Sequence, residues 1–151
     1  MRRIVTVLIA TAALTGMGVP PAAAAQAHQF RGHINTTARQ AGPTAPVMIE
    51  GSGIISGLGV TTMSGSEVVN PITGSISGSA TFTAASGDAL SFAWSDVAVA
   101  GAPPAITFGG PMTVTDGTRR LAERAGTVTF TGGFNFITGQ GWFDVTGSIG
   151  E

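Results

Sequence analysis

The amino-acid sequence predicts an all-β protein, a small antiparallel up-and-down barrel of about eight strands. Two observations support this prediction: apolar and hydroxyl-bearing residues alternate with a period of two along most of the chain, and turn-forming residues interrupt the alternation at short intervals. A closed sheet would bury its one apolar face and leave no open edge, around an interior that side chains fill or that holds one small ligand. A sandwich of two sheets has the same period and stays the alternative.

The alternation is clearest in four segments. Residues 75–84 alternate serine and threonine with apolar residues or glycine, and residues 89–95 place leucine, phenylalanine and tryptophan on one side. Residues 112–115 and 127–131 repeat the pattern with threonine as the polar partner. Only residues 121–125 have helical spacing, enough for one turn. Chain reversals are expected where glycine, proline, asparagine and aspartate cluster, at residues 57–59, 70–71, 86–88, 103–104, 109–111, 116–117, 132–133 and 139–141.

Residues 1–27 are typical of a secretory signal peptide. Arg2 and Arg3 precede an apolar run over residues 4–14, helix breakers follow, and A-x-A patterns predict cleavage after Ala25 or Ala27. A membrane anchor is the alternative, but the run is shorter than the roughly 20 residues that cross a bilayer. We therefore expect a secreted, extracellular protein. Its flexible N-terminal arm would span residues 28–46, with one short strand near residues 30–34, and its barrel domain would span residues 47–151.

The composition excludes several chemistries. The chain has 10% charged residues, no cysteine and no tyrosine, and all seven of its basic residues are arginine. Disulfides, thiolate nucleophiles, Schiff-base lysines and phenol acids are therefore ruled out. Removal of residues 1–27 would take away two arginines and no acid, so the net charge would change from −1 to −3. Because the five remaining arginines are scattered, we expect neither a nucleic acid nor a membrane as a partner of the mature chain.

One segment resembles a known family. Residues 116–126, DGTRRLAERAG, and residues 127–132, TVTFTG, resemble the G-G-T-G-R-F-A-x-A-x-G and S-G-T-F-T-G signature of secreted bacterial proteins in the allene oxide cyclase-like, dirigent-like barrel superfamily. Arg119 stands where that pattern has glycine, and Leu121 replaces its usual phenylalanine. The resemblance extends over most of residues 47–150.

This resemblance implies an eight-stranded barrel with an apolar lumen, often assembled into homodimers or homotrimers. Characterised members cyclise an oxylipin epoxide or steer the coupling of phenoxy radicals, whereas many bacterial members have no known activity. The matching positions would form a motif loop, in which Arg120 is expected to hold the loop through carbonyl or carboxylate contacts. The residues of this loop are Gly117, Thr118, Arg120 and Gly126.

Asp96 and Glu50 are the candidate catalytic residues. Asp96 continues the apolar stripe of residues 90, 92 and 94, so in a regular strand it would face the apolar side, where burial raises the pKa of a carboxyl group. Alternatively the strand ends at Ser95 and Asp96 lies in a loop, since charged residues are rarely buried. Glu50 precedes Gly51 and would lie at a barrel mouth or be an ordinary surface acid. Asp144 is expected in solvent.

Large apolar side chains on the strand faces are candidates for the lining of a ligand pocket, or they simply form the core. These residues are Phe82, Leu90, Phe92, Trp94 and Phe130. His28 and His33 are the only histidines and fall in the predicted arm, and no G-x-S-x-G motif is present. We therefore expect no hydrolase triad, no metal site and no cofactor.

Three functions stay open from the sequence. The first is a secreted barrel that binds a small lipophilic molecule without covalent catalysis. The second, which the resemblance implies, is a cyclase or isomerase that acts by confining its substrate beside one carboxylate. The third is a filled barrel that self-associates and has a structural or surface-interaction role. The volume and lining of the barrel interior would separate them, because ligand pockets typically hold about 300 Å³ or more.

Overall fold

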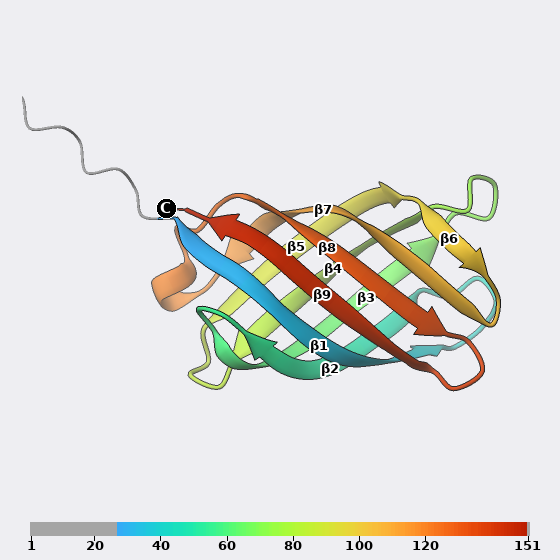
Figure 1. Cartoon of the computed structure of the whole chain (residues 1–151), viewed down its shortest axis with the longest axis horizontal. Coiled ribbons are helices and arrows are strands. Elements are labelled where there is room, and N and C mark those ends of the chain that lie inside the picture. Colours follow the sequence, from blue (N-terminus) through green and yellow to red (C-terminus); the bar gives the residue numbers. More distant parts are fainter. Residues whose placement is uncertain (1–26, 151) are drawn as a thin grey trace, which may run out of the picture.

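The computed structural model describes residues 27–150, which form one closed antiparallel barrel (Figure 1). The strands follow one another around the barrel in chain order, β1 pairs with β9, and pairing of β5 with β7 closes the sheet. Eight strands make the barrel, and the short strand β6 extends it by pairing with β7. This confirms the up-and-down barrel and excludes the sandwich. The predicted signal peptide lies, except for Ala27, outside the described residues.

The elements have the following bounds: β1 (His28–Gln40), β2 (Val47–Ile55), β3 (Gly59–Val69), β4 (Ile76–Ala84), β5 (Ala89–Val97), β6 (Val99–Ala102), β7 (Ala105–Gly117), the 3₁₀ turn η1 (Arg119–Leu121), β8 (Thr127–Asn135) and β9 (Gln140–Ile149).

The predicted flexible arm is wrong, because residues 28–40 form the long strand β1 between β2 and β9. Phe30, Ile34 and Thr36 are buried on its inward face. Gly32 continues that face, and a Cβ there would lie 2.7 Å from the Ile55 side chain. The inward stripe therefore contains a glycine and a threonine, which hide its apolar character. The barrel begins at His28 rather than at residue 47.

Aromatic rings fill the barrel interior. Phe82, Phe92 and Phe130 have no exposed surface, as the sequence predicts. The Phe82 and Phe92 rings lie 5.6 Å apart near one end of the barrel, and Phe130 stacks on Phe143 at 5.2 Å further along it. Side chains thus occupy the centre of this eight-stranded barrel, the filled form of such a structure.

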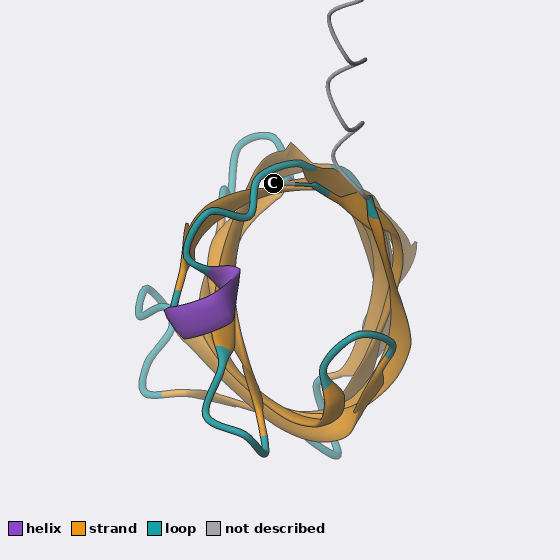
Figure 2. Cartoon of the chain, turned by 90° about the vertical axis from the view of Figure 1, so that its left-hand side faces the viewer, coloured by secondary structure: helices purple, strands orange, loops and turns teal. Residues whose placement is uncertain are grey.

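The two ends of the barrel differ. We call one the motif end, formed by residues 56–58, 85–88 and 118–126, and the other the apolar end, formed by residues 41–46, 70–75, 103–104 and 136–139. The motif end lies on the left of Figure 1 and the apolar end on the right. Figure 2 looks at the motif end and shows η1 on the rim of the oval barrel.

Candidate functional site

Neither predicted catalytic carboxylate faces the interior. Asp96 is exposed because β5 has a bulge: Trp94 pairs with Gly78 and Val97 pairs with Ile76, so β5 holds one extra residue between these pairs. The inward stripe therefore passes from Trp94 to Val97 and skips Asp96, which adopts a φ of 51°. The prediction that Asp96 faces the apolar side is wrong. The alternative that the strand ends at Ser95 is wrong as well, because β5 continues to Val97 and Asp96 is an exposed residue within it.

Asp96 and Glu50 have ordinary surface environments. The backbone N–H of Asp96 donates a hydrogen bond to Ser77 Oγ at 2.9 Å, and Ser75 Oγ donates one to Asp96 Oδ1 at 3.3 Å. Asp96 thus ties the start of β4 to the bulge in β5. Glu50 is exposed on the outer face of β2, opposite Ser64 of β3. Neither side chain is placed to act on a molecule inside the barrel.

The five candidate lining residues belong to the core. Phe82, Leu90, Phe92 and Phe130 have no exposed surface and Trp94 is 4% exposed. They pack against other side chains, as in the 5.1 Å ring contact between Trp94 and Phe130. None of them borders the pocket at the apolar end of the barrel. Their structural interpretation as core residues therefore describes them best.

The apolar end contains a pocket that leads into the barrel. Its cavity volume is about 20 Å³, which is room for one water molecule. The lining is apolar except for one threonine and one glutamate, and Phe134 and Phe136 form part of its outer wall. The lining residues are Thr36, Ala38, Val47, Ile49, Glu67, Val69, Ile76, Ile106, Phe108, Gly133, Phe134, Phe136 and Phe143.

Glu67 is the one carboxylate in this pocket. It lies near the end of β3 with its side chain turned inward, and it is 6% exposed. Its Oε1 atom forms no hydrogen bond with any described residue. Burial in this apolar environment raises the pKa of Glu67 to about 7, because desolvation penalises the charged form. The carboxyl group therefore changes its protonation state near neutral pH.

A second polar group without a partner lies next to Glu67. The Trp94 Nε1 atom is buried and has no hydrogen-bond acceptor within the described chain. Gly78, on the strand between them, pairs with Glu67 on one side and Trp94 on the other. A Cβ on Gly78 would lie 2.8 Å from Trp94 Cζ2 and 3.0 Å from Glu67 Cγ, so both side chains occupy the space that Gly78 leaves free.

Buried groups without hydrogen bonds are uncommon in folded proteins and call for an explanation. Here the Trp94 ring and the Glu67 side chain approach the same glycine, but only Glu67 lines the apolar mouth. A bound polar group that donates a hydrogen bond would satisfy Glu67 Oε1. The arrangement is suited to holding one polar group of an otherwise apolar molecule.

Glu67 is not evident from the sequence because the alternation in β3 is mixed on both faces. The exposed Val60 and Val68 share the outer wall with hydroxyl residues, whereas the polar Thr61 and Glu67 face inward with Met63. The available signal was the shared parity of Met63 and Glu67, which are four residues apart and therefore on the same face of a strand.

The outer wall has a charged pair of its own. His33 Nδ1 lies 2.6 Å from Asp144 Oδ1 on neighbouring strands, and His33 Nε2 lies 3.3 Å from Asn35 Oδ1. Both side chains of the ion pair are about half exposed. With both ring nitrogens engaged and no nucleophile bonded to them, the pair is a surface contact rather than part of a catalytic triad.

We expect the Asp144→Asn substitution to lower the pKa of His33. The hydrogen bond that His33 donates to Asp144 is the main cause that raises this pKa, with a smaller contribution from the hydrogen bond to Asn35. Titration of the His33 ring protons by NMR, in the natural chain and in the variant, measures the change. An unchanged His33 pKa in the variant would show that the pair does not persist in solution.

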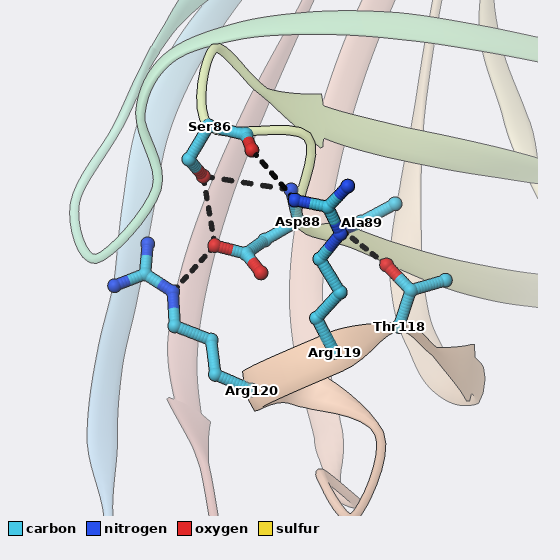
Figure 3. Close-up of polar contacts among 6 residues, drawn as sticks. All are labelled: Ser86, Asp88, Ala89, Thr118, Arg119 and Arg120. Atoms are coloured by element: carbon cyan, nitrogen blue, oxygen red, sulfur yellow. Dashed lines mark hydrogen bonds and ion pairs between the residues drawn. The ribbon is translucent and has the colours of Figure 1, made fainter.

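The predicted motif loop closes the motif end (Figure 3). Arg120 Nε contacts Asp88 Oδ2 at 2.5 Å, so Arg120 holds the loop through a carboxylate as expected. The hydrogen bond from Ser86 and the contact with Arg120 lower the pKa of Asp88. Thr118 Oγ1 accepts a hydrogen bond from the Ala89 backbone N–H at 3.0 Å. These contacts fasten η1 to the turn between β4 and β5.

Two glycines and one arginine shape the motif loop. A Cβ on Gly117 would lie 2.0 Å from the Leu121 carbonyl oxygen, and Gly126 has a φ of 139°. Arg119, which replaces a glycine of the signature, adopts a φ of 53°, a left-handed conformation that glycine accepts at lower cost. Its guanidinium donates a hydrogen bond to the Ser86 carbonyl oxygen at 3.2 Å. The loop thus serves a structural role.

Comparison of the chain with protein-family models, with curated proteins and with solved structures yields no match. The resemblance drawn from residues 116–132 therefore stays a prediction. Within residues 27–150 no three histidine, aspartate or glutamate side chains come together in a way that would hold a metal ion. The same residues contain no helix long and apolar enough to span a membrane.

Proposed function

We propose that this chain is an exported barrel that binds a small lipophilic molecule at its apolar end without covalent catalysis. The observation that carries the proposal is Glu67, a buried carboxyl group whose Oε1 atom has no hydrogen-bond partner among residues 27–150, in a pocket otherwise lined by apolar residues and one threonine. Small-molecule sites typically combine an apolar lining with a few polar groups that orient the ligand. The sequence of residues 1–27 supports export, and the resemblance to the allene oxide cyclase-like superfamily supports a lipophilic ligand.

Ligand entry requires the pocket to widen. Its volume of about 20 Å³ accepts no molecule larger than water, so side chains of the mouth must move outward. Phe136 is 49% exposed and packs edge-to-face on Phe134 at 5.1 Å. Both rings belong to the wall nearest the solvent, and their displacement would open the pocket without disturbing the aromatic core around Phe130.

Binding of N-phenyl-1-naphthylamine, an apolar fluorescent molecule with one N–H donor, tests the proposal. We expect saturable 1:1 binding with increased fluorescence. Glu67→Leu should weaken it about tenfold, the effect of losing one hydrogen bond to a charged group. Glu50→Gln, on the outer wall, is the matched control and should bind as the natural chain does. Absence of saturable binding would contradict the proposal and favour the filled, structural barrel, which the packed interior also supports.

A second candidate function is proton-transfer catalysis, as in a cyclase or isomerase. The specific observation is the Glu67 pKa of about 7, since a group with this pKa donates and accepts protons effectively near neutral pH. Glu67, rather than Asp96 or Glu50, would then be the carboxylate that acts on a confined substrate. Turnover that persists in a Glu67→Gln variant would exclude this role, while probe binding by the same variant would show that the pocket is intact.

A further inference from the structure

Two loops at the apolar end share one sequence and one geometry. Each connects two neighbouring strands, β3 to β4 in one case and β8 to β9 in the other, and Figure 1 shows both at the right-hand end of the barrel. Both read Asn-x-Ile-Thr-Gly, and we call them the twin loops. They are Asn70-Pro71-Ile72-Thr73-Gly74 and Asn135-Phe136-Ile137-Thr138-Gly139.

The asparagine side chain organises the first twin loop. Asn70 Oδ1 accepts hydrogen bonds from the backbone N–H groups of Ile72 at 2.9 Å and Thr73 at 3.3 Å. The Gly74 N–H donates to the Asn70 carbonyl oxygen at 2.8 Å, and Gly74 has a φ of 70°. Thr73 Oγ1 accepts from the Ser75 N–H at 3.3 Å.

The second twin loop repeats each of these contacts. Asn135 Oδ1 accepts from the N–H groups of Ile137 at 2.9 Å and Thr138 at 3.1 Å. The Gly139 N–H donates to the Asn135 carbonyl oxygen at 2.9 Å, and Gly139 also has a φ of 70°. Thr138 Oγ1 accepts from the Gln140 N–H at 3.3 Å. The chain thus builds the same rigid turn twice.

In both turns the isoleucine side chain has no structural role. The asparagine, threonine and glycine supply the hydrogen bonds and the left-handed backbone that the turn needs. The isoleucines contribute only their backbone N–H groups, and their side chains are 92% exposed at Ile72 and 80% exposed at Ile137. A polar residue would form the same turn, so the turn itself does not account for the two apolar tips that protrude at this end.

Charge is distributed unequally between the ends. No loop of the apolar end contains a charged residue, whereas the motif end carries Asp88 and the four charged residues at 119, 120, 123 and 124. Arg39 and Asp96 are exposed on the strands below the apolar-end loops. An uncharged end with apolar tips matches a surface that is itself uncharged and apolar below its head groups.

We propose that the twin loops dock the barrel on an uncharged lipid surface by inserting Ile72 and Ile137, so that the apolar mouth faces the lipid. Protein interfaces surround their buried centre with a polar rim and about one hydrogen bond per 100–200 Å². The twin loops instead direct their polar groups inward, into their own turns. Binding to a lipid surface grows with the apolar area that projecting side chains bury, and on uncharged lipid this term acts without electrostatic attraction.

This inference departs from the expectation that the chain has no membrane partner. That expectation rested on the scattered arginines, which give no attraction to anionic lipid but leave apolar insertion open. The docking goes beyond the proposed function and does not depend on it. Where both hold, a lipophilic ligand would pass between lipid and pocket without crossing water.

Co-sedimentation of the full chain with phosphatidylcholine vesicles tests the docking. We expect binding that is insensitive to salt, because no charge takes part. Ile72→Ser and Ile137→Ser should each weaken it about tenfold, and the double substitution about a hundredfold, from the lost burial of one or two side chains. Ile54→Ser with Val60→Ser is the matched control, since these outer-wall residues are 67% and 65% exposed. It should bind as the natural chain does.

A local readout separates the loops from the apolar residues 1–27, which all variants share. The chain has no cysteine, so Ile137→Cys and Ile54→Cys each provide a single labelling position for an environment-sensitive dye. We expect vesicles to shift the emission of the dye at position 137 to the blue and to leave that at position 54 unchanged.

Three results would overturn the proposal. The first is full vesicle binding by the double variant, and the second is an equal loss of binding by the Ile54 and Val60 control. The third is self-association without lipid that the double variant abolishes in sedimentation velocity, since a second copy would then occupy the tips. Glu67→Gln should still bind vesicles, so the docking and the ligand pocket fail or succeed separately.

Discussion

Replacement of Phe130 by alanine is expected to lower the free energy of unfolding by about 3–5 kcal/mol, the usual cost of deleting a buried aromatic side chain. Phe130 has no exposed surface and lies at the centre of an aromatic cluster, 5.1 Å from Trp94 and 5.2 Å from Phe143. The surrounding rings belong to strands fixed by barrel pairing, which limits how far they can move into the space left behind. Urea denaturation measures the change.

Phe136→Ala is the matched control for Phe130→Ala. Its ring is half exposed on a twin loop, so we expect a loss of less than about 1 kcal/mol, in the range of surface substitutions. Equal losses in the two variants would contradict the picture of a barrel stabilised by its filled centre. The Phe130→Ala variant also tests function, because a hollow barrel that gains affinity for N-phenyl-1-naphthylamine would show that the natural interior leaves no room for it.

The sequence predicted the barrel because the relevant information is local. The period of two in residues 75–84 and 89–95 identifies the inward face of β4 and β5, and Phe82, Phe92 and Trp94 are buried there. Reversal residues mark the loops for the same reason at residues 57–59, 70–71, 86–88, 103–104 and 139–141. The reversals predicted at residues 109–111 and 132–133 are wrong, because these residues lie within β7 and β8. For β1 the sequence predicts only a short strand near residues 30–34, because glycine and threonine replace large apolar residues on the inward face of the longer strand. Ile55 of the neighbouring strand fills the space beside Gly32.

The candidate site depends on relations between strands, which the sequence does not show. Asp96 would face inward in a regular β5, but the bulge between the Trp94 and Val97 pairs turns it outward. Glu67 is buried because Gly78 on the adjacent strand leaves space for its side chain beside Trp94. The bulge in β5 therefore exposes Asp96, and the glycine on the neighbouring strand allows Glu67 to be buried. Both features follow from strand register rather than from local sequence pattern.

The stability of the natural chain is expected to fall by about 3 kcal/mol as the pH rises from about 4.5 to above 7, through Glu67 alone. Its pKa is about 7 in the fold and 4.5 as the ordinary value, so between these values the folded chain retains a proton that the unfolded chain has lost. Folding is therefore favoured on the acid side of this window. Above it, the fold must bury an ionised carboxylate.

Glu67→Gln should remove most of this pH dependence, because the amide keeps the shape of the side chain but does not ionise. We expect the variant to unfold at similar urea concentrations at pH 5 and pH 8, and to be more stable than the natural chain at pH 8. His33, whose pKa is also raised, shifts stability in the same direction, so both chains are compared in the Asp144→Asn background. If the pH dependence of stability is unchanged in the Glu67→Gln variant, Glu67 does not cause it, and solvent reaches the Glu67 carboxylate in the natural chain. The ligand proposal would then lose the buried acceptor on which it rests.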